Sequence, residues 1–140
     1  MLKVVVDTNQ FISSLIGREG FSAKLINAWR RHKFTLVINR DIFEEIKRVF
    51  YYPRIMKARG LDKGEVEAFI DFIEKRAIIL SNTPMVDVIK EDPDDNSVLA
   101  AALKAKADYI VSGDAHLLEL KNYQGIPIVT VKEFLTVIRD

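Results

Sequence analysis

Short apolar runs alternate along the chain with longer segments of helical periodicity. Apolar runs rich in β-branched or aromatic residues predict strands at 2–6, 34–38, 77–80, 109–112 and 126–131. Apolar residues spaced three and four apart predict helices at 21–32, 41–51, 63–76, 94–107 and 132–139. This alternation favours a parallel sheet, because each parallel connection needs a crossover. We therefore expect an α/β protein with a mainly parallel central sheet covered by helices on both faces.

The length and composition favour one compact domain. The chain has 140 residues, of which 49% are hydrophobic, and it contains no internal repeat or linker. No run of eighteen apolar residues occurs, and Met1 leads directly into the first predicted strand rather than into a secretory leader. We expect a single domain over residues 1–140 in a soluble, cytoplasmic protein without membrane contact.

Cysteine is absent, which limits the possible chemistry. Disulfides, thiolate metal sites and cysteine nucleophiles are excluded, so any metal must be held by oxygen or imidazole. The two histidines, His32 and His116, are expected at the surface.

Charge is unevenly distributed along the chain, although the net charge is only +1. Residues 1–60 carry 12 Lys/Arg and 5 Asp/Glu, whereas residues 61–140 carry 9 Lys/Arg and 15 Asp/Glu. This division suits a cationic surface for a polyanion and a separate acidic pocket, although ordinary solvated charge explains it equally well.

Two of the most apolar predicted strands are each followed by an aspartate, Asp7 and Asp114. Ligands of open parallel sheets bind beyond the carboxyl ends of the strands, so these two side chains should converge. Taken singly, each is explained as a turn residue or helix cap. Their pairing at one sheet edge is what indicates a site.

Two helices add further carboxylates. On the helix at 41–51, the helical period places Glu45 at the border of the buried stripe and Glu44 away from it. A solvated boundary glutamate is the simpler explanation for Glu45 alone. On the helix at 94–107, Asp95 heads the inward stripe and Asp94 is offset, although acidic residues at a helix start are also favoured by capping.

If Asp7, Glu45, Asp95 and Asp114 meet, their charges repel unless some are protonated or a cation neutralises them. Oxygen ligands favour Mg²⁺ or Mn²⁺, and such ions at carboxylates suit phosphodiester hydrolysis. Neither a P-loop nor a dinucleotide-binding glycine pattern is present.

The order of four motifs resembles the PIN-domain family over essentially the whole chain. They are VVVDTNQFI at 4–12, IFEEI at 42–46, DPDDN at 92–96 and IVSGD at 110–114, and IVT at 128–130 closes the pattern. The chain looks most like the prokaryotic, VapC-like PIN proteins that are assigned as toxin ribonucleases.

This resemblance implies a three-layer α/β/α sandwich and an endoribonuclease dependent on Mg²⁺ or Mn²⁺. It implies metal ligation and catalysis by Asp7, Asp95 and Asp114, with Glu45 completing the acidic pocket as a fourth catalytic and metal-binding carboxylate. Thr8, Asn9 and Ser112 match supporting positions. Asp92 matches an acidic position too, and the sequence leaves open whether it binds metal or shapes the turn. The resemblance further implies a homodimer and an antitoxin partner.

Basic residues in the first half are candidates for RNA contacts. We select Arg30, Arg31, Lys33, Arg40 and Arg48, although cations at a helix end are also favoured by the helix dipole. The nearby aromatic residues Trp29, Tyr51 and Tyr52 are expected in the core or at a dimer contact rather than stacked on bases.

Two other functional classes remain. A PIN-type module without catalysis would bind RNA or assemble with partners, but it would be expected to lack an acidic ligand, and all four carboxylates are present. A phosphatase-like or phosphoacceptor α/β domain would also place an aspartate after its first strand. However, Asp7-Thr8-Asn9 lacks the second aspartate of such phosphatases, and Lys132 does not follow the last strand in the setting that receiver domains need.

Overall fold

The computed structural model describes residues 1–10 and 20–139, and for residues 21, 22, 58 and 59 it describes the backbone alone. Phe11 and Ile12 of the first motif lie outside this range. The strands are β1 (Lys3–Val6), β2 (Thr35–Asn39), β3 (Ile78–Leu80), β4 (Tyr109–Val111), β5 (Asn122–Tyr123) and β6 (Ile126–Val129). The helices are α2 (Phe21–Arg30), α3 (Arg40–Phe50), α4 (Pro53–Arg59), α5 (Lys63–Arg76), α6 (Pro93–Ala105), α7 (Ala115–Leu120) and α8 (Val131–Ile138).

The strands form a six-stranded sheet in the order β3-β2-β1-β4-β6-β5. The first five of these run parallel, and β5 pairs antiparallel with β6. β1 lies inside the sheet, with Val5 opposite Val37 of β2 and Ile110 of β4. Val4, Val5 and Val6 have no exposed surface, as expected of a parallel strand covered on both faces. The prediction of a mainly parallel α/β sheet is confirmed.

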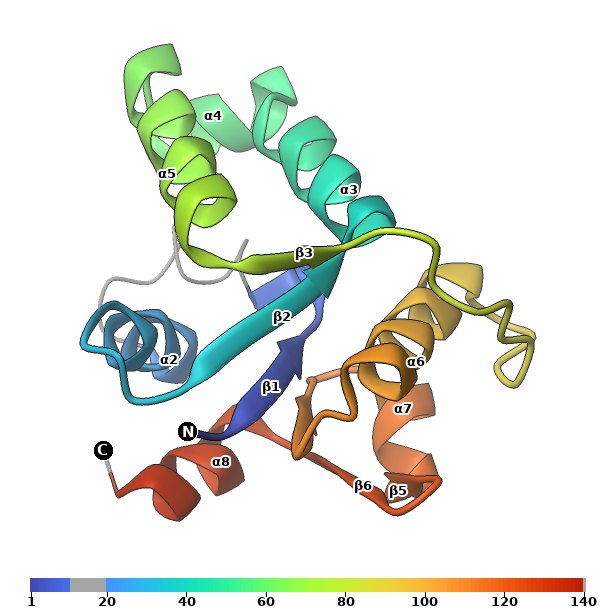
Figure 1. The fold of residues 1–140 in the computed structure, drawn as a ribbon. Coiled ribbons are helices and arrows are strands. Elements are labelled where there is room, and N and C mark those ends of the chain that lie inside the picture. The colour runs from blue at the N-terminus through green and yellow to red at the C-terminus, as the bar shows by residue number, and fades with distance from the viewer. Residues whose placement is uncertain (11–19, 140) are drawn as a thin grey trace.

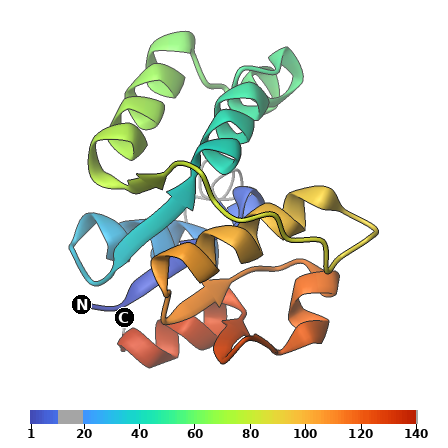
Figure 2. The same cartoon turned by 45° about the vertical axis from the view of Figure 1, so that its right-hand side comes forward.

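Helices cover both faces of this sheet (Figures 1 and 2). α6 packs across β1, β2 and β4 on one face, while α2 and α8 lie against each other on the opposite face. Phe134 of α8 makes edge-to-face contacts with Phe34 and Tyr109, at ring-centroid distances of 5.2 and 5.6 Å. The arrangement is the three-layer sandwich that the family resemblance implied. In the described part of the chain, no helix has the length and apolar character needed to cross a membrane.

Three elements were not predicted. α4 has only seven residues, but Pro53 occupies its first turn and Gly60, at a φ of +61°, ends it in the left-handed conformation. α7 follows Asp114 directly, and the short β5 joins β6 through Gln124 and Gly125, both at positive φ. Short elements bury too few residues to produce a clear periodic pattern, so only their end signals were available.

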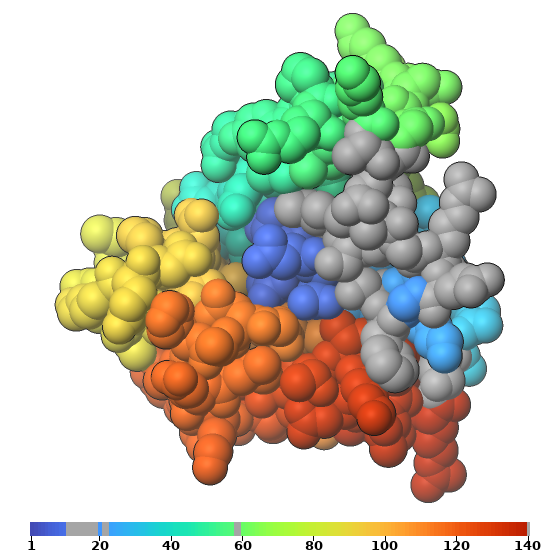
Figure 3. Space-filling model, turned by 180° about the vertical axis from the view of Figure 1, so that it is seen from behind, coloured from blue at the N-terminus to red at the C-terminus, as the bar shows by residue number. Residues whose placement is uncertain are grey.

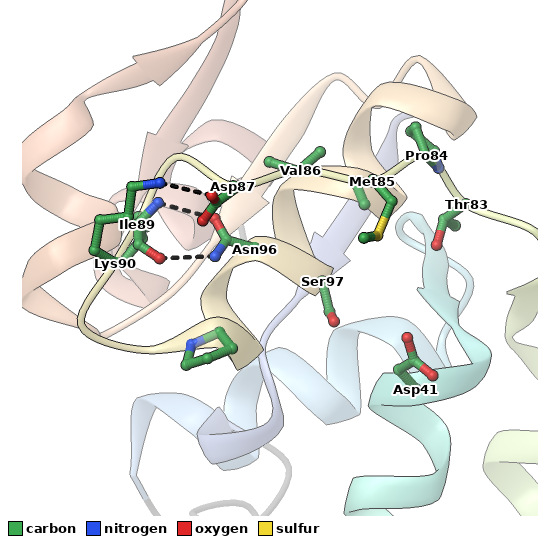
Figure 4. Close-up of a pocket in the computed structure, with 12 residues that line it drawn as sticks. Asp41, Thr83, Pro84, Met85, Val86, Asp87, Ile89, Lys90, Asn96 and Ser97 are labelled. Carbon is green, nitrogen blue, oxygen red and sulfur yellow. Dashed lines mark hydrogen bonds and ion pairs between the residues drawn. The ribbon is translucent and has the colours of Figure 1, made fainter.

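The connection from β3 to α6 crosses the start of α6 as an extended strap, residues 81–92. Asn96 holds it: its Oδ1 accepts hydrogen bonds from the backbone N–H groups of Val88 (3.0 Å) and Ile89 (2.9 Å), and its Nδ2 donates to the carbonyl of Ile89 (2.7 Å). A pocket of about 440 Å³ lies between the strap and α6, and Figure 4 shows Met85 and Thr83 on its strap side.

Candidate active site

The site lies at the carboxyl edge of the sheet, where β1 and β4 end side by side. Asp7 follows β1, and its backbone N–H donates to the carbonyl of Val111, the last residue of β4 (3.2 Å). Ser112, Gly113 and Asp114 follow β4. The predicted convergence of Asp7 and Asp114 is confirmed, because parallel neighbouring strands end at the same edge.

A chain of hydrogen bonds joins the two aspartates. The hydroxyl of Ser112 donates to Oδ2 of Asp7, and the backbone N–H of Asp114 donates to the Ser112 hydroxyl oxygen (2.9 Å). Oδ1 of Asp114 accepts from the N–H groups of His116 (2.8 Å) and Leu117 (3.2 Å), so it also caps α7. The Ser112 side chain is fully buried and links Asp7 to the backbone of Asp114 through these two hydrogen bonds.

Asp7 is buried beneath this turn, with 5% of its surface exposed. Burial raises the pKa of its carboxyl, the Ser112 hydroxyl lowers it, and the negative charge of Asp114 raises it again. The carboxylate of Asp7 also accepts from the backbone N–H of Gln10 (3.3 Å). Both of its oxygens therefore have hydrogen-bond partners within the protein.

Asp95 projects into the same pocket from the first turn of α6. It is 6% exposed, whereas its neighbour Asp94 is exposed to solvent, as the helical period predicted. Oδ2 of Asp95 is buried without a hydrogen-bond partner. Burial, the hydrogen-bonding contact with Asp114 and the charges of Asp114, Asp92 and Asp7 raise the pKa of Asp95 to about 7. Asp95 is thus the carboxylate most in need of a counter-charge.

Glu45 borders the pocket from α3. It is half-buried, whereas Glu44 is exposed and pairs with Lys47 at 3.1 Å, in agreement with the predicted orientations. Burial and the nearby charge of Asp94 raise the pKa of Glu45, and a hydrogen bond with Thr8 lowers it. The structure thus brings Asp7, Asp95 and Asp114 together and places Glu45 on the side of Asp92 and Asp94.

α3 and α6 are tied together beside the pocket by Asn39. Its Oδ1 accepts from the backbone N–H of Ile42 (2.8 Å) and caps α3, and its Nδ2 donates to the carbonyl of Ser97 (3.0 Å). Asn39 is 1% exposed. This contact fixes the helix that carries Glu45 against the helix that carries Asp95.

His116 was not predicted as part of the site. It is exposed, as expected, but its Nδ1 lies 3.7 Å from Oδ1 of Asp114. A carboxylate oxygen of Asp95, a carboxylate oxygen of Asp114 and a ring nitrogen of His116 lie within 4.8 Å of one another. The available sequence signal was its position two residues after Asp114, at the start of a short helix.

The remaining predicted residues lie in three places. The Asp92 side chain accepts a hydrogen bond from the backbone N–H of Asp94 (3.0 Å) and so caps α6. Of the predicted supporting residues near β1, Asn9 is exposed and Thr8 contacts Glu45. Arg40 and Arg48 lie on α3, on the site's side of the sheet. Arg30, Arg31 and Lys33 lie where α2 leads into β2, at the opposite, amino edge of the sheet. The structure therefore separates the five predicted RNA-contacting residues into two groups.

The donors of the pocket fit a hard divalent cation. They are carboxylate oxygens with one imidazole nearby, and one buried oxygen lacks a hydrogen-bond partner. Burial first, and then the charges of neighbouring carboxylates, raise the pKa values of Asp7 and Asp95. From behind, the blue surface of the residues after β1 lies between α3, the start of α6 and α7 (Figure 3). The pocket beneath the strap is separate, because none of the four predicted catalytic carboxylates lines it.

Comparison with known proteins agrees with this geometry. The family model described as PIN domain matches residues 3–116, a stretch that contains all four carboxylates and His116. An uncharacterized protein of Methanocaldococcus jannaschii is 30% identical over 142 residues, covering 96% of this chain and 90% of the relative. PIN domains are generally nucleases that use divalent metals. The chain belongs to the PIN-domain family.

Proposed function

We propose that the chain is a metal-dependent endoribonuclease that hydrolyses RNA phosphodiester bonds in the pocket of Asp7, Asp95 and Asp114. The observation that supports this most directly is the Asp95 carboxylate. Its Oδ2 is buried without a partner, and the charges of Asp114, Asp92 and Asp7 act on it. Such an oxygen is costly to bury unless a proton or a cation neutralises it. The oxygen-rich donor set favours Mg²⁺ or Mn²⁺.

Asp95 and Asp114 would hold the ion, with Asp7 beneath them and His116 as an additional donor. When bound, the ion would position the phosphate, lower the pKa of a bound water and stabilise the leaving oxygen. The protein's contribution is placement. Asp7 and Ser112 fix Asp114 through their hydrogen bonds, and the Asn39 bridge fixes α3 against α6.

Glu45 would act beside the metal ligands as a proton acceptor. Burial and the charge of Asp94 raise its pKa, which makes its carboxylate a stronger base than that of an exposed glutamate. Its hydrogen bond with Thr8 orients it on the border of the pocket. Its role would therefore be to take a proton from the attacking water or to orient that water.

The resemblance to VapC-like proteins supports finer proposals. We propose RNA as the substrate, a single catalytic domain over residues 1–140 and a homodimer in the cytoplasm. We also propose that the protein is the toxin of a toxin–antitoxin pair, whose antitoxin covers or occupies the acidic pocket.

The test compares cleavage of labelled single-stranded and structured RNAs with Mg²⁺, Mn²⁺ or EDTA. The variants are Asp7→Asn, Asp114→Asn and Glu45→Gln. Glu44→Gln is the matched control, because Glu44 is adjacent to Glu45 on the same helix but exposed. Circular dichroism verifies that each variant is folded.

Cleavage that needs metal, Asp7 and Asp114, and that is lowered in Glu45→Gln but not in Glu44→Gln, is the expected result. Cleavage in EDTA, or cleavage undiminished in both aspartate variants, would refute the assignment of the pocket. RNA binding without cleavage of any RNA under these conditions would favour a PIN-type binding module instead.

A further inference from the structure

Residues 46–61 form a basic corner of the molecule. It consists of the end of α3, all of α4, and the residues between and just after these helices. Its sixteen residues contain Lys47, Arg48, Arg54, Lys57 and Arg59 and no Asp or Glu, although the whole chain has a net charge of only +1. Lys47 pairs with Glu44, and Arg48 interacts with Glu45. Arg54 and Lys57 are exposed, and within the described residues neither has an ion-pair partner. The corner therefore presents uncompensated positive charge.

Two tyrosines lie on the same corner. Tyr51 is 38% exposed and Tyr52 47% exposed, so neither lies in the core, which was one of the two places expected for them. Among the described residues, no other ring and no cation stacks on either of them. A hollow of about 380 Å³ is lined by Tyr52, Pro53, Arg54 and Ile55. Aromatic faces and cations are thus open to solvent together.

The backbone of Tyr52 is hydrogen-bonded on both sides. The N–H of Tyr52 donates to the carbonyl of Val49 (3.1 Å), which continues the helical path beyond the end of α3. The carbonyl of Tyr52 accepts from the N–H groups of Ile55 (2.9 Å) and Met56 (3.1 Å). The backbone of Tyr52 is therefore held between two helices, so binding a ligand needs to order only the side chain.

The corner is joined to the catalytic pocket through α3. α3 carries Glu45 and ends at Phe50, and Tyr51 and Tyr52 follow it directly. At a rise of about 1.5 Å per residue, Tyr52 lies about 10 Å beyond Glu45 along the chain's helical path. That distance corresponds to about three nucleotides at the spacing of about 3.4 Å per nucleotide found in a duplex strand. Figure 3 shows teal α3 beside the blue surface of the site, with green α4 beyond it on the same face.

We propose that this corner binds single-stranded RNA next to the scissile phosphate, with bases stacked on Tyr52 and Tyr51 and phosphates paired with Arg54 and Lys57. The proposal rests on the nuclease function proposed above. Single-strand binding surfaces combine cations that follow the backbone with aromatic faces that stack on bases, and sequence preference is weak where stacking dominates. The tyrosines would thus position unpaired nucleotides with little regard to base identity.

The test measures binding of a labelled single-stranded RNA by fluorescence anisotropy in EDTA, where metal-dependent cleavage does not interfere. The variants are Tyr52→Ala, Tyr51→Ala, Tyr52→Phe and the pair Arg54→Ala with Lys57→Ala. Met85→Ala is the control for loss of an exposed apolar side chain, because Met85 is fully exposed on the strap. Lys121→Ala is the control for loss of an exposed cation. Each variant is also examined by circular dichroism and gel filtration.

Each tyrosine-to-alanine change should raise the Kd roughly five-fold to 150-fold, because base stacking on an aromatic residue is worth about 1–3 kcal/mol. Tyr52→Phe should bind nearly as wild type, because it keeps the ring. The Arg54 and Lys57 pair should reduce the slope of log affinity against log salt by about 1.4, which is about 0.7 per charge on a single strand. Both controls should bind RNA as the wild type does.

Metal-dependent cleavage by wild type with an unchanged Kd in both tyrosine variants would overturn this proposal and leave the nuclease function standing. A changed oligomeric state in Tyr52→Ala with unchanged RNA affinity would assign the corner to contact between copies and would overturn it as well. If the tyrosine variants lose binding but no RNA is cleaved with any metal, the corner stands as an RNA surface and the nuclease function falls.

Discussion

Replacing Asp95 with Asn should stabilise the metal-free protein at neutral and alkaline pH. The Asp95 carboxyl is buried beside Asp114, and burial together with that contact raises its pKa to about 7 from an ordinary value of 3.8. Folding therefore opposes ionisation of this group. Asparagine keeps the shape of the side chain and cannot ionise, so the variant avoids the penalty.

The size of the effect follows from the pKa. The difference between about 7 and 3.8, at about 1.4 kcal/mol per unit, gives an upper bound of about 4 kcal/mol. The pocket opens to water at Asp114 and His116, whose side chains are 22% and 44% exposed. Solvent screening reduces the bound to roughly 2 kcal/mol. For a domain of this size, that free energy corresponds to a rise in Tm of about 4–8 °C.

The pH dependence has a defined sign. The folded-state pKa of Asp95 is raised, so below about pH 4 the group is protonated in both the folded and the unfolded state and costs no stability. As the pH rises from about 4 to about 7, the unfolded state ionises more readily, and the free energy of unfolding of the wild type falls. The advantage of Asp95→Asn should therefore be absent near pH 4, grow up to pH 7 and stay constant above it.

Thermal unfolding in EDTA at several pH values measures this advantage, with Asp94→Asn as the matched control on the exposed neighbour. Adding Mg²⁺ at about a hundred times its Kd should stabilise the wild type by about 2.7 kcal/mol and should leave Asp95→Asn nearly unchanged. A variant that is less stable than the wild type in EDTA at pH 8, or an advantage equal at pH 4 and pH 8, would refute the reasoning.

Three further predictions concern the supports of the pocket. Ser112→Ala leaves Oδ2 of Asp7 and the N–H of Asp114 without their partner, so urea denaturation should show a loss of about 1–3 kcal/mol. Asn96→Ala releases the strap at Val88 and Ile89, and limited proteolysis should then cut within residues 83–90 faster than in the wild type. Asn39→Asp keeps the cap of α3 but replaces the donor to the Ser97 carbonyl with a buried carboxylate oxygen, so urea denaturation should show a clear loss of stability; stability equal to that of the wild type would contradict a role for that bridge.

Much of the fold was predictable because its long elements carry strong periodic signals. The helix at 63–76 agrees residue for residue with α5, which begins with a capping box of Asp62 and Glu65. The meeting of Asp7 and Asp114 followed from topology, since the ends of adjacent parallel strands must lie together. The opposite orientations of Glu44 and Glu45 followed from the helical period alone.

Other features depend on tertiary contacts that no local pattern contains. The place of His116 beside Asp95 arises because α7 starts only three residues after β4, while α6 reaches the pocket from a different part of the chain. The separation of Arg30, Arg31 and Lys33 from the carboxylates has a topological cause. They precede β2, and a parallel strand begins at the edge opposite the one where its neighbours end.

The two ends of the sheet limit how copies of the protein can associate. At one end β5 has two residues and turns back at Gln124 and Gly125, and at the other end β3 has three residues before the strap leaves the sheet. Edges this short offer few backbone groups to an incoming strand, which protects against edge-to-edge growth. For the part of the chain that the structure describes, these short edges disfavour a continuous sheet across two copies and favour contact through helix side chains.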